Sequence, residues 1–66
     1  MQIKIYLYNK NGKVPMRPNF ILDAPQERAY PLFDQLYKDI NIGNQKFVKC
    51  DAVIFERERF AFATCC

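Results

Sequence analysis

Residues 46–66, KFVKCDAVIFERERFAFATCC, decide the fold, because this final third alternates between two kinds of side chain. Alternation is typical of a β-strand, in which successive side chains point to opposite faces of the sheet. In its first half, one face is small and apolar, formed by Val48, Cys50, Ala52 and Ile54. The opposite face is larger and mixed, formed by Phe47, Lys49, Asp51, Val53 and Phe55. The pattern predicts a strand over 46–56 that has one face on the core and the other free to meet a partner.

A second strand is predicted over 59–65, where both sides of the alternation are apolar, as in a strand with neighbours or cover on both faces. The charged run Glu56-Arg57-Glu58-Arg59 lies between the two strands. This run lacks the Gly or Asn that a two-residue hairpin turn prefers, so we expect either a strained turn or one bent ribbon.

The N-terminal residues 1–8 alternate strictly between aliphatic and polar or aromatic side chains, which predicts another strand. Asn11-Gly12 follows within the segment 9–13 and predicts a tight turn, because these residues readily adopt positive φ. Pro15 and Pro18 cannot donate ladder hydrogen bonds. The return strand is therefore expected to be an irregular edge strand or to be delayed until 19–22.

One amphipathic helix is predicted in the middle of the chain, with Asp23 as its N-cap and Gln26 completing a capping box. Its apolar stripe consists of Ala29, Leu32, Phe33, Leu36, Tyr37 and Ile40. Pro31 would remove a hydrogen bond from a helix interior, so the helix is expected either to kink at this residue or to begin there. Gly43 is expected to end the helix in the left-handed conformation.

Together these segments predict an α+β fold of ββαββ order, with a four-stranded antiparallel sheet and one helix on one face. Residues 1–66 are expected to form a single domain, since a chain of this length buries only about 60% of its unfolded surface and cannot support a second core.

An enzyme is not expected from this set of residues. The chain has no histidine, and its only glycines are in a turn and at a helix end, so no glycine-rich phosphate loop is present. Asp51, Glu56 and Glu58 lie near one another in sequence, but Arg57 and Arg59 alternate with the glutamates and would neutralise them. We therefore predict no catalytic residue and no cofactor.

The three cysteines do not suggest a metal site or a disulfide framework. Structural zinc sites usually have four Cys or His ligands, whereas Cys65 and Cys66 are adjacent and Cys50 alternates with apolar residues as a small buried side chain would. No signal peptide or membrane-spanning segment is apparent. We expect a cytoplasmic protein with reduced thiols and no membrane partner.

Binding is the function that the sequence favours. Aromatic and basic residues are predicted on the uncovered side of the sheet and at its charged tip: Lys4, Tyr6, Tyr8, Phe47, Lys49, Val53, Phe55, Arg57 and Arg59. Such an apolar patch exceeds what a soluble monomer usually exposes, so we predict a partner protein or a homodimer formed through a sheet face or edge, as in an accessory or inhibitory factor. The alternative is single-stranded nucleic acid, whose bases stack on aromatic side chains and whose phosphates bind Lys and Arg. The net charge of only +3 favours the protein partner.

Overall fold

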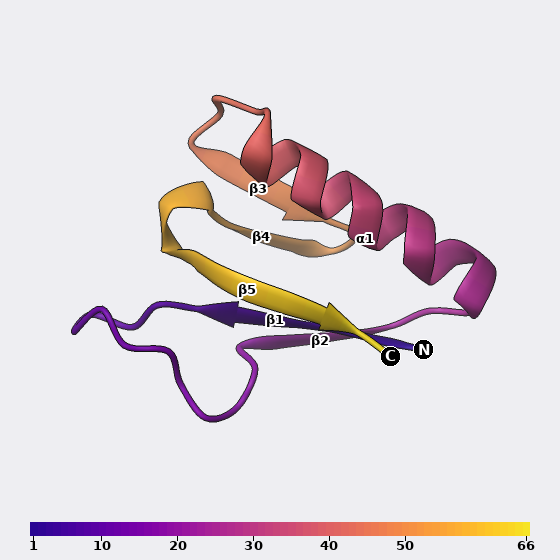
Figure 1. The fold of residues 1–66 in the computed structure, drawn as a ribbon, viewed down its shortest axis with the longest axis horizontal. Helices are drawn as coiled ribbons and strands as arrows, with labels where there is room; N and C mark the ends of the chain where they lie inside the picture. Colours follow the sequence, from indigo (N-terminus) through magenta and orange to yellow (C-terminus); the bar gives the residue numbers. More distant parts are fainter.

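The strands of this protein form two antiparallel sheets rather than one, in a computed structural model that describes all residues 1–66 (Figure 1). The elements in chain order are β1 (Gln2–Leu7), β2 (Phe20–Asp23), α1 (Gln26–Asn41), β3 (Phe47–Cys50), β4 (Val53–Glu56), the 3-10 helix η1 (Arg57–Arg59) and β5 (Phe60–Cys65). The three-stranded sheet has the order β2-β1-β5, and β3 pairs with β4 in a separate hairpin. The predicted α+β class is confirmed, whereas the prediction of a single four-stranded sheet is wrong.

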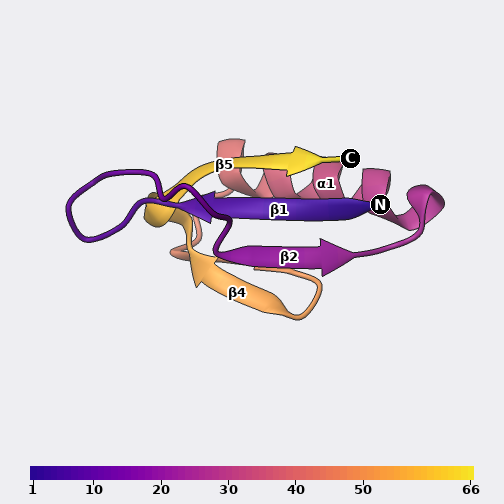
Figure 2. The same cartoon turned by 90° about the horizontal axis from the view of Figure 1, so that it is seen from below.

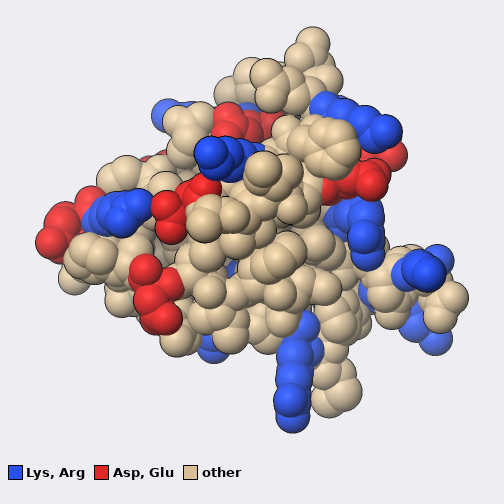
Figure 3. All heavy atoms as spheres, turned by 180° about the vertical axis from the view of Figure 1, so that it is seen from behind, with Lys and Arg blue, Asp and Glu red and all other residues tan.

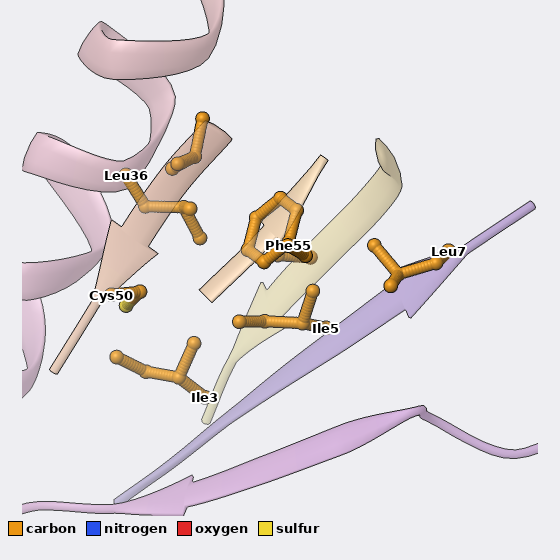
Figure 4. Close-up of a cluster of buried hydrophobic side chains, with 8 residues drawn as sticks. Ile3, Ile5, Leu7, Leu36, Cys50 and Phe55 are labelled. Atoms are coloured by element: carbon orange, nitrogen blue, oxygen red, sulfur yellow. The ribbon is translucent and has the colours of Figure 1, made fainter. Parts of the chain in front are cut away.

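The core lies between two layers. In Figure 1 the three-stranded sheet forms the lower layer, while α1 and the β3–β4 hairpin form the upper one. Figure 4 shows Ile3, Ile5 and Leu7 of β1 pointing toward Leu36 and Phe55 in the upper layer. The eight buried residues of the core are Ile3, Ile5, Leu7, Leu36, Val48, Cys50, Phe55 and Ala63. The aliphatic side of the predicted first strand is therefore the side that faces the core.

A two-residue turn at Asp51 and Ala52 is the reason why the predicted long strand is two short ones. Asp51 has a φ of 55°, a left-handed conformation that Asp tolerates better than most residues. The chain reverses there, so that Cys50 pairs with Val53 and Val48 pairs with Phe55. Because directly paired residues share a face, Val53 and Phe55 lie on the core side and not on the exposed side where the alternation placed them.

The charged run is also not the tip of a hairpin. Residues 57–59 form η1, which carries the chain from β4 in the upper layer to β5 in the lower one. The pairing of β5 with β1 then shifts by one residue, since Tyr6 pairs with Phe62 and Leu7 pairs with Phe60. This irregularity turns Phe60 toward the core while Phe62 points out.

Helix α1 begins later than predicted. Asp23 is the last residue of β2, Pro25 is the N-cap, and no side chain caps the helix, so the predicted capping box is wrong. The helix continues through Pro31 and does not begin there. Its predicted apolar stripe is confirmed, because Ala29 and Leu36 are buried and the other stripe residues pack against the core. This helix is not long and apolar enough to span a membrane.

The end of α1 depends on glycine for a different reason than predicted. Gly43 has no positive φ, so the expected left-handed cap is wrong. A Cβ atom at Gly43 would instead lie 2.4 Å from the backbone oxygen of Asp39, and the Gly43 amide donates to this oxygen at 3.2 Å. Only a residue without a side chain allows the backbone to approach so closely.

The connection between β1 and β2 begins with the predicted turn. Gly12 has a φ of 77°, and its amide donates to the Asn9 backbone oxygen at 3.0 Å. The Asn9 side-chain oxygen accepts hydrogen bonds from the amides of Asn11 and Lys13. The delayed return as an edge strand is confirmed, because β2 begins only at Phe20 and pairs on one side alone.

Candidate binding face

One face of the three-stranded sheet has no element packed on it. Figure 2 looks directly onto this face, with α1 and the hairpin behind the sheet. Pairing across the strands places seven side chains on it, namely Gln2, Lys4, Tyr6, Ile21, Asp23, Phe62 and Thr64. We call this surface the outer face.

Apolar and aromatic groups form the centre of the outer face. Tyr6 and Phe62 stack across β1 and β5, with ring centroids 4.3 Å apart and an interplanar angle of 13°. Ile21 is 51% exposed and Phe62 is 41% exposed, so the two strands that flank β1 each leave a large apolar side chain in contact with water. The ammonium group of Lys4 forms no ion pair in this structure. The outer face therefore combines an apolar centre with one unpaired positive charge, Lys4, and one unpaired negative charge, Asp23.

The residues predicted as one binding face are divided among several surfaces. Lys4 and Tyr6 lie on the outer face, and Tyr8 follows it at the end of β1, 39% exposed. Phe47 and Lys49 project from β3 on the exposed side of the hairpin, which belongs to the other layer. Val53 and Phe55 face the core. The structure therefore does not bring these aromatic residues together on one sheet.

Arg57 and Arg59 form hydrogen bonds to backbone oxygens of other segments where the chain crosses between the layers. The Arg57 Nε donates to the Gln45 backbone oxygen at 2.8 Å. The guanidinium of Arg59 reaches the Tyr8 backbone oxygen at 3.2 Å, and the Tyr8 amide donates to the Arg59 oxygen at 2.7 Å. Both predicted arginines therefore form hydrogen bonds to the backbone of another segment, in addition to carrying a positive charge.

Two groups of exposed residues were not predicted. Ile21 and Phe62 complete the apolar centre of the outer face, but only the strand register reveals that they lie beside Lys4 and Tyr6. The β1–β2 connection, residues 8–19, carries Lys10, Lys13 and Arg17 and no acidic residue. This second group was visible in the sequence as a local excess of positive charge.

The outer edge of β5 is protected by a tyrosine of the helix. The Tyr37 hydroxyl accepts a hydrogen bond from the Ala63 amide at 3.0 Å and donates one to the Ala63 oxygen at 3.1 Å. One side chain thereby satisfies both backbone groups that another strand would need at this position. Pairing of a partner strand with β5 is therefore blocked at its middle.

Tyr37→Phe is expected to lower the free energy of unfolding by about 1 kcal/mol, because it removes two hydrogen bonds at a position that water can partly reach. Urea titration followed by circular dichroism measures the change. Tyr30→Phe, at an exposed position of the same helix with no hydrogen bond to its hydroxyl, is the control and should leave stability unchanged. Equal stability of both variants and the wild type would contradict a structural role for the Tyr37 hydroxyl.

The cysteines differ in exposure and do not gather into a site. Cys50 is buried, Cys65 is half-buried and Cys66 is exposed, and all three are free thiols. Burial raises the pKa of the Cys50 thiol, and the negative charges of Asp51 and Asp39 raise it further. Cys50 is therefore a core side chain of low nucleophilicity. No group of three or more His, Cys, Asp or Glu side chains is arranged to hold a metal ion.

One cavity is present, far from the outer face. It has a volume of about 240 Å³ and lies between the C-terminal end of α1 and β3, beside Asp39, Gly43 and Phe47. Only two of its seven lining residues are hydrophobic, whereas small-molecule sites are larger and mostly apolar. The outer face is therefore the stronger candidate for a binding site.

Comparison of the chain with protein-family models, with curated proteins and with solved structures finds no match.

Proposed function

We propose that this chain is a small non-catalytic binding protein that associates with a second copy of itself through the outer face. The observation that carries the proposal is the uncovered apolar centre of this face, formed by Tyr6, Ile21 and Phe62. A domain of this size buries few residues, and only ten are buried here. Covering the outer face with a second copy would add the apolar burial that a small core lacks.

The stacked pair favours a protein surface over a nucleobase. Base stacking requires a free aromatic ring face, and the mutual stack of Tyr6 and Phe62 leaves each ring one such face instead of two. Their ring edges and the side chain of Ile21 remain available, and these are surfaces on which apolar side chains of a protein pack well.

The outer face also suits association better than the sheet edges do. The β5 edge is occupied by Tyr37, and β2 offers an edge of only four residues. Short edge strands give few backbone hydrogen bonds to a partner strand. Face-to-face packing is therefore the form of self-association that we propose.

The test compares the wild type with a face variant, Ile21→Lys with Phe62→Lys, by sedimentation equilibrium over a wide range of concentrations. The wild type is expected to reach twice the chain mass of 7.8 kDa. The face variant should raise the dissociation constant at least about a hundredfold, because charges replace apolar contacts at the centre of the interface.

Ile54→Lys is the matched control, since Ile54 is 60% exposed on the hairpin and not on the outer face. This control should form dimers like the wild type. A wild type that stays monomeric at every concentration, or a control that dissociates as readily as the face variant, would contradict the proposal.

Single-stranded nucleic acid is the second candidate, and the three cations of the β1–β2 connection are the observation that favours it. Titration of a labelled oligonucleotide into the same proteins separates the two candidates. Affinity that falls steeply with salt, together with a monomeric wild type, would support nucleic-acid binding instead of self-association.

A further inference from the structure

The β1–β2 connection carries the entire net charge of the protein. Lys10, Lys13 and Arg17 account for the net charge of +3, since the remaining seven basic residues equal the seven acidic ones in number. None of these three side chains forms an ion pair, because the structure has only one, between Arg28 and Asp51. One end of the molecule is therefore strongly positive relative to the rest.

Unpaired acidic groups lie at the opposite end. Asp23 closes β2 on the outer face, and Glu27 follows in the first turn of α1. Arg28 is close in sequence, but its guanidinium is held by Asp51 at 2.9 Å. In Figure 1 the β1–β2 connection and the β2–α1 corner lie at opposite ends of the longest axis, which measures 35 Å. Figure 3, seen from behind, shows several Lys and Arg groups at the right-hand end and several Asp and Glu groups at the left-hand end, and each end also carries charges of the opposite sign.

The size of the sheet requires that a dimer interface extend beyond it. Three strands of at most six residues present about 300 Å² of flat area, given a rise of about 3.4 Å per residue and a strand spacing of about 4.8 Å. A stable interface buries about 800 Å² on each partner. In Figure 1 the β1–β2 connection drops below the sheet on the side of the outer face, so it would reach around a copy packed there.

Two limiting arrangements of such a dimer differ in the direction of the two-fold axis, which lies in the plane of the interface and runs either along the strands or across them. An axis along the strands would place the two basic connections together, with six positive charges side by side. An axis across the strands would place each connection against Asp23 and Glu27 of the other copy. Charges separated by more than a Debye length of about 8 Å are screened from each other. The charges that face each other directly across the interface therefore determine which arrangement is more stable.

On the basis of the self-association proposed above, we infer that the two copies pack antiparallel. The β1–β2 connection of each copy then lies against Asp23 and Glu27 of the other. Opposite charges at both ends then fix the orientation of the dimer, while the apolar centre supplies most of its affinity. The partner that the outer face recognises is therefore a copy of the same chain in one defined direction.

Charge reversal tests this orientation with two variants. The connection variant is Lys13→Glu with Arg17→Glu, and the corner variant is Asp23→Lys with Glu27→Lys; all four side chains are exposed. Each variant alone places like charges together at both ends of an antiparallel dimer, so its dissociation constant should rise about tenfold or more. An equal mixture of the two restores opposite charges at both ends. Sedimentation and native mass spectrometry of the mixture should therefore show heterodimers as the dominant species.

Other outcomes overturn the inference in distinguishable ways. If the connection variant pairs most tightly with the wild type, then the connections lie together and the copies are parallel. If all charge variants dimerise like the wild type, charge does not set the orientation, although self-association stands. If the wild type is monomeric, self-association itself fails and so does this inference; loss of oligonucleotide binding in the connection variant would then assign the connection to nucleic acid. Thermal unfolding of each variant checks that it is folded.

Discussion

Phe55→Ala is expected to lower the free energy of unfolding by about 3–5 kcal/mol, the usual range for removing a buried aromatic ring. Phe55 is 5% exposed, lies opposite Val48 in the hairpin, and stacks with Phe60 at a centroid distance of 6.0 Å. Its removal leaves a cavity between the two layers. A domain of this length has a total stability of about 3–10 kcal/mol, so this variant should be close to unfolding at room temperature.

Ile54→Ala is the control for Phe55, because it changes the neighbouring residue on the opposite side of the same strand. Ile54 is 60% exposed, so Ile54→Ala should lower the free energy of unfolding by less than about 1 kcal/mol. Urea unfolding of both variants, followed by circular dichroism, compares the two values. A larger loss for Ile54→Ala would contradict the two-residue turn at Asp51, since Ile54 faces the core only in an uninterrupted strand.

Gly43→Ala is expected to lower the free energy of unfolding by about 2–3 kcal/mol, at the upper end of the range for substitutions that overpack a site. Alanine ordinarily stabilises a protein relative to glycine by restricting the unfolded chain. Here the new Cβ would lie 2.4 Å from the Asp39 backbone oxygen, which cannot move without disturbing the last turn of α1. The loss should appear both in the free energy of unfolding and in the helical circular dichroism signal.

Asn44→Ala, at the next residue in the chain, is the control for Gly43 because Asn44 is exposed. It should leave both measurements nearly unchanged. Equal stability of Gly43→Ala and Asn44→Ala would show that the end of α1 adjusts easily to a side chain.

The elements that the sequence predicts well are those in which local pattern and burial agree. The alternation of residues 1–8 correctly assigns Ile3, Ile5 and Leu7 to the core. The stripe of α1 is likewise predicted, because a helix with one apolar side has only one way to face a sheet. Asn11-Gly12 forms the expected turn, since glycine is the residue best suited to positive φ.

The hairpin was not predicted, because its turn contains neither Gly nor Asn. Asp51 adopts a positive φ at a modest cost in energy, which tertiary packing of the hairpin against α1 offsets. A two-residue turn reverses the direction of the chain, so each residue after the turn lies on the face opposite to the one that uninterrupted alternation predicts. This single position explains why Phe55 belongs to the core and Ile54 to the surface.

The candidate binding face was predicted only in its central strand. Lys4 and Tyr6 follow from alternation in β1, while Ile21 and Phe62 depend on which strands flank β1 and in which register. The partner strand β5 lies at the other end of the chain, and one shifted residue in its pairing decides whether Phe60 or Phe62 points outward. Long-range pairing of this kind leaves no local signal in the sequence.

The central position of β1 also determines the order in which the protein can fold. Its two neighbours come from residues 20–23 and residues 60–65, so one side of β1 stays unpaired until the last strand has been synthesised. Joining β1 to β5 closes a loop that contains all other elements, and such non-local pairing slows folding. Until then the aliphatic side of β1 is only partly covered, and contact with a chaperone or with another growing chain is most favourable during this interval.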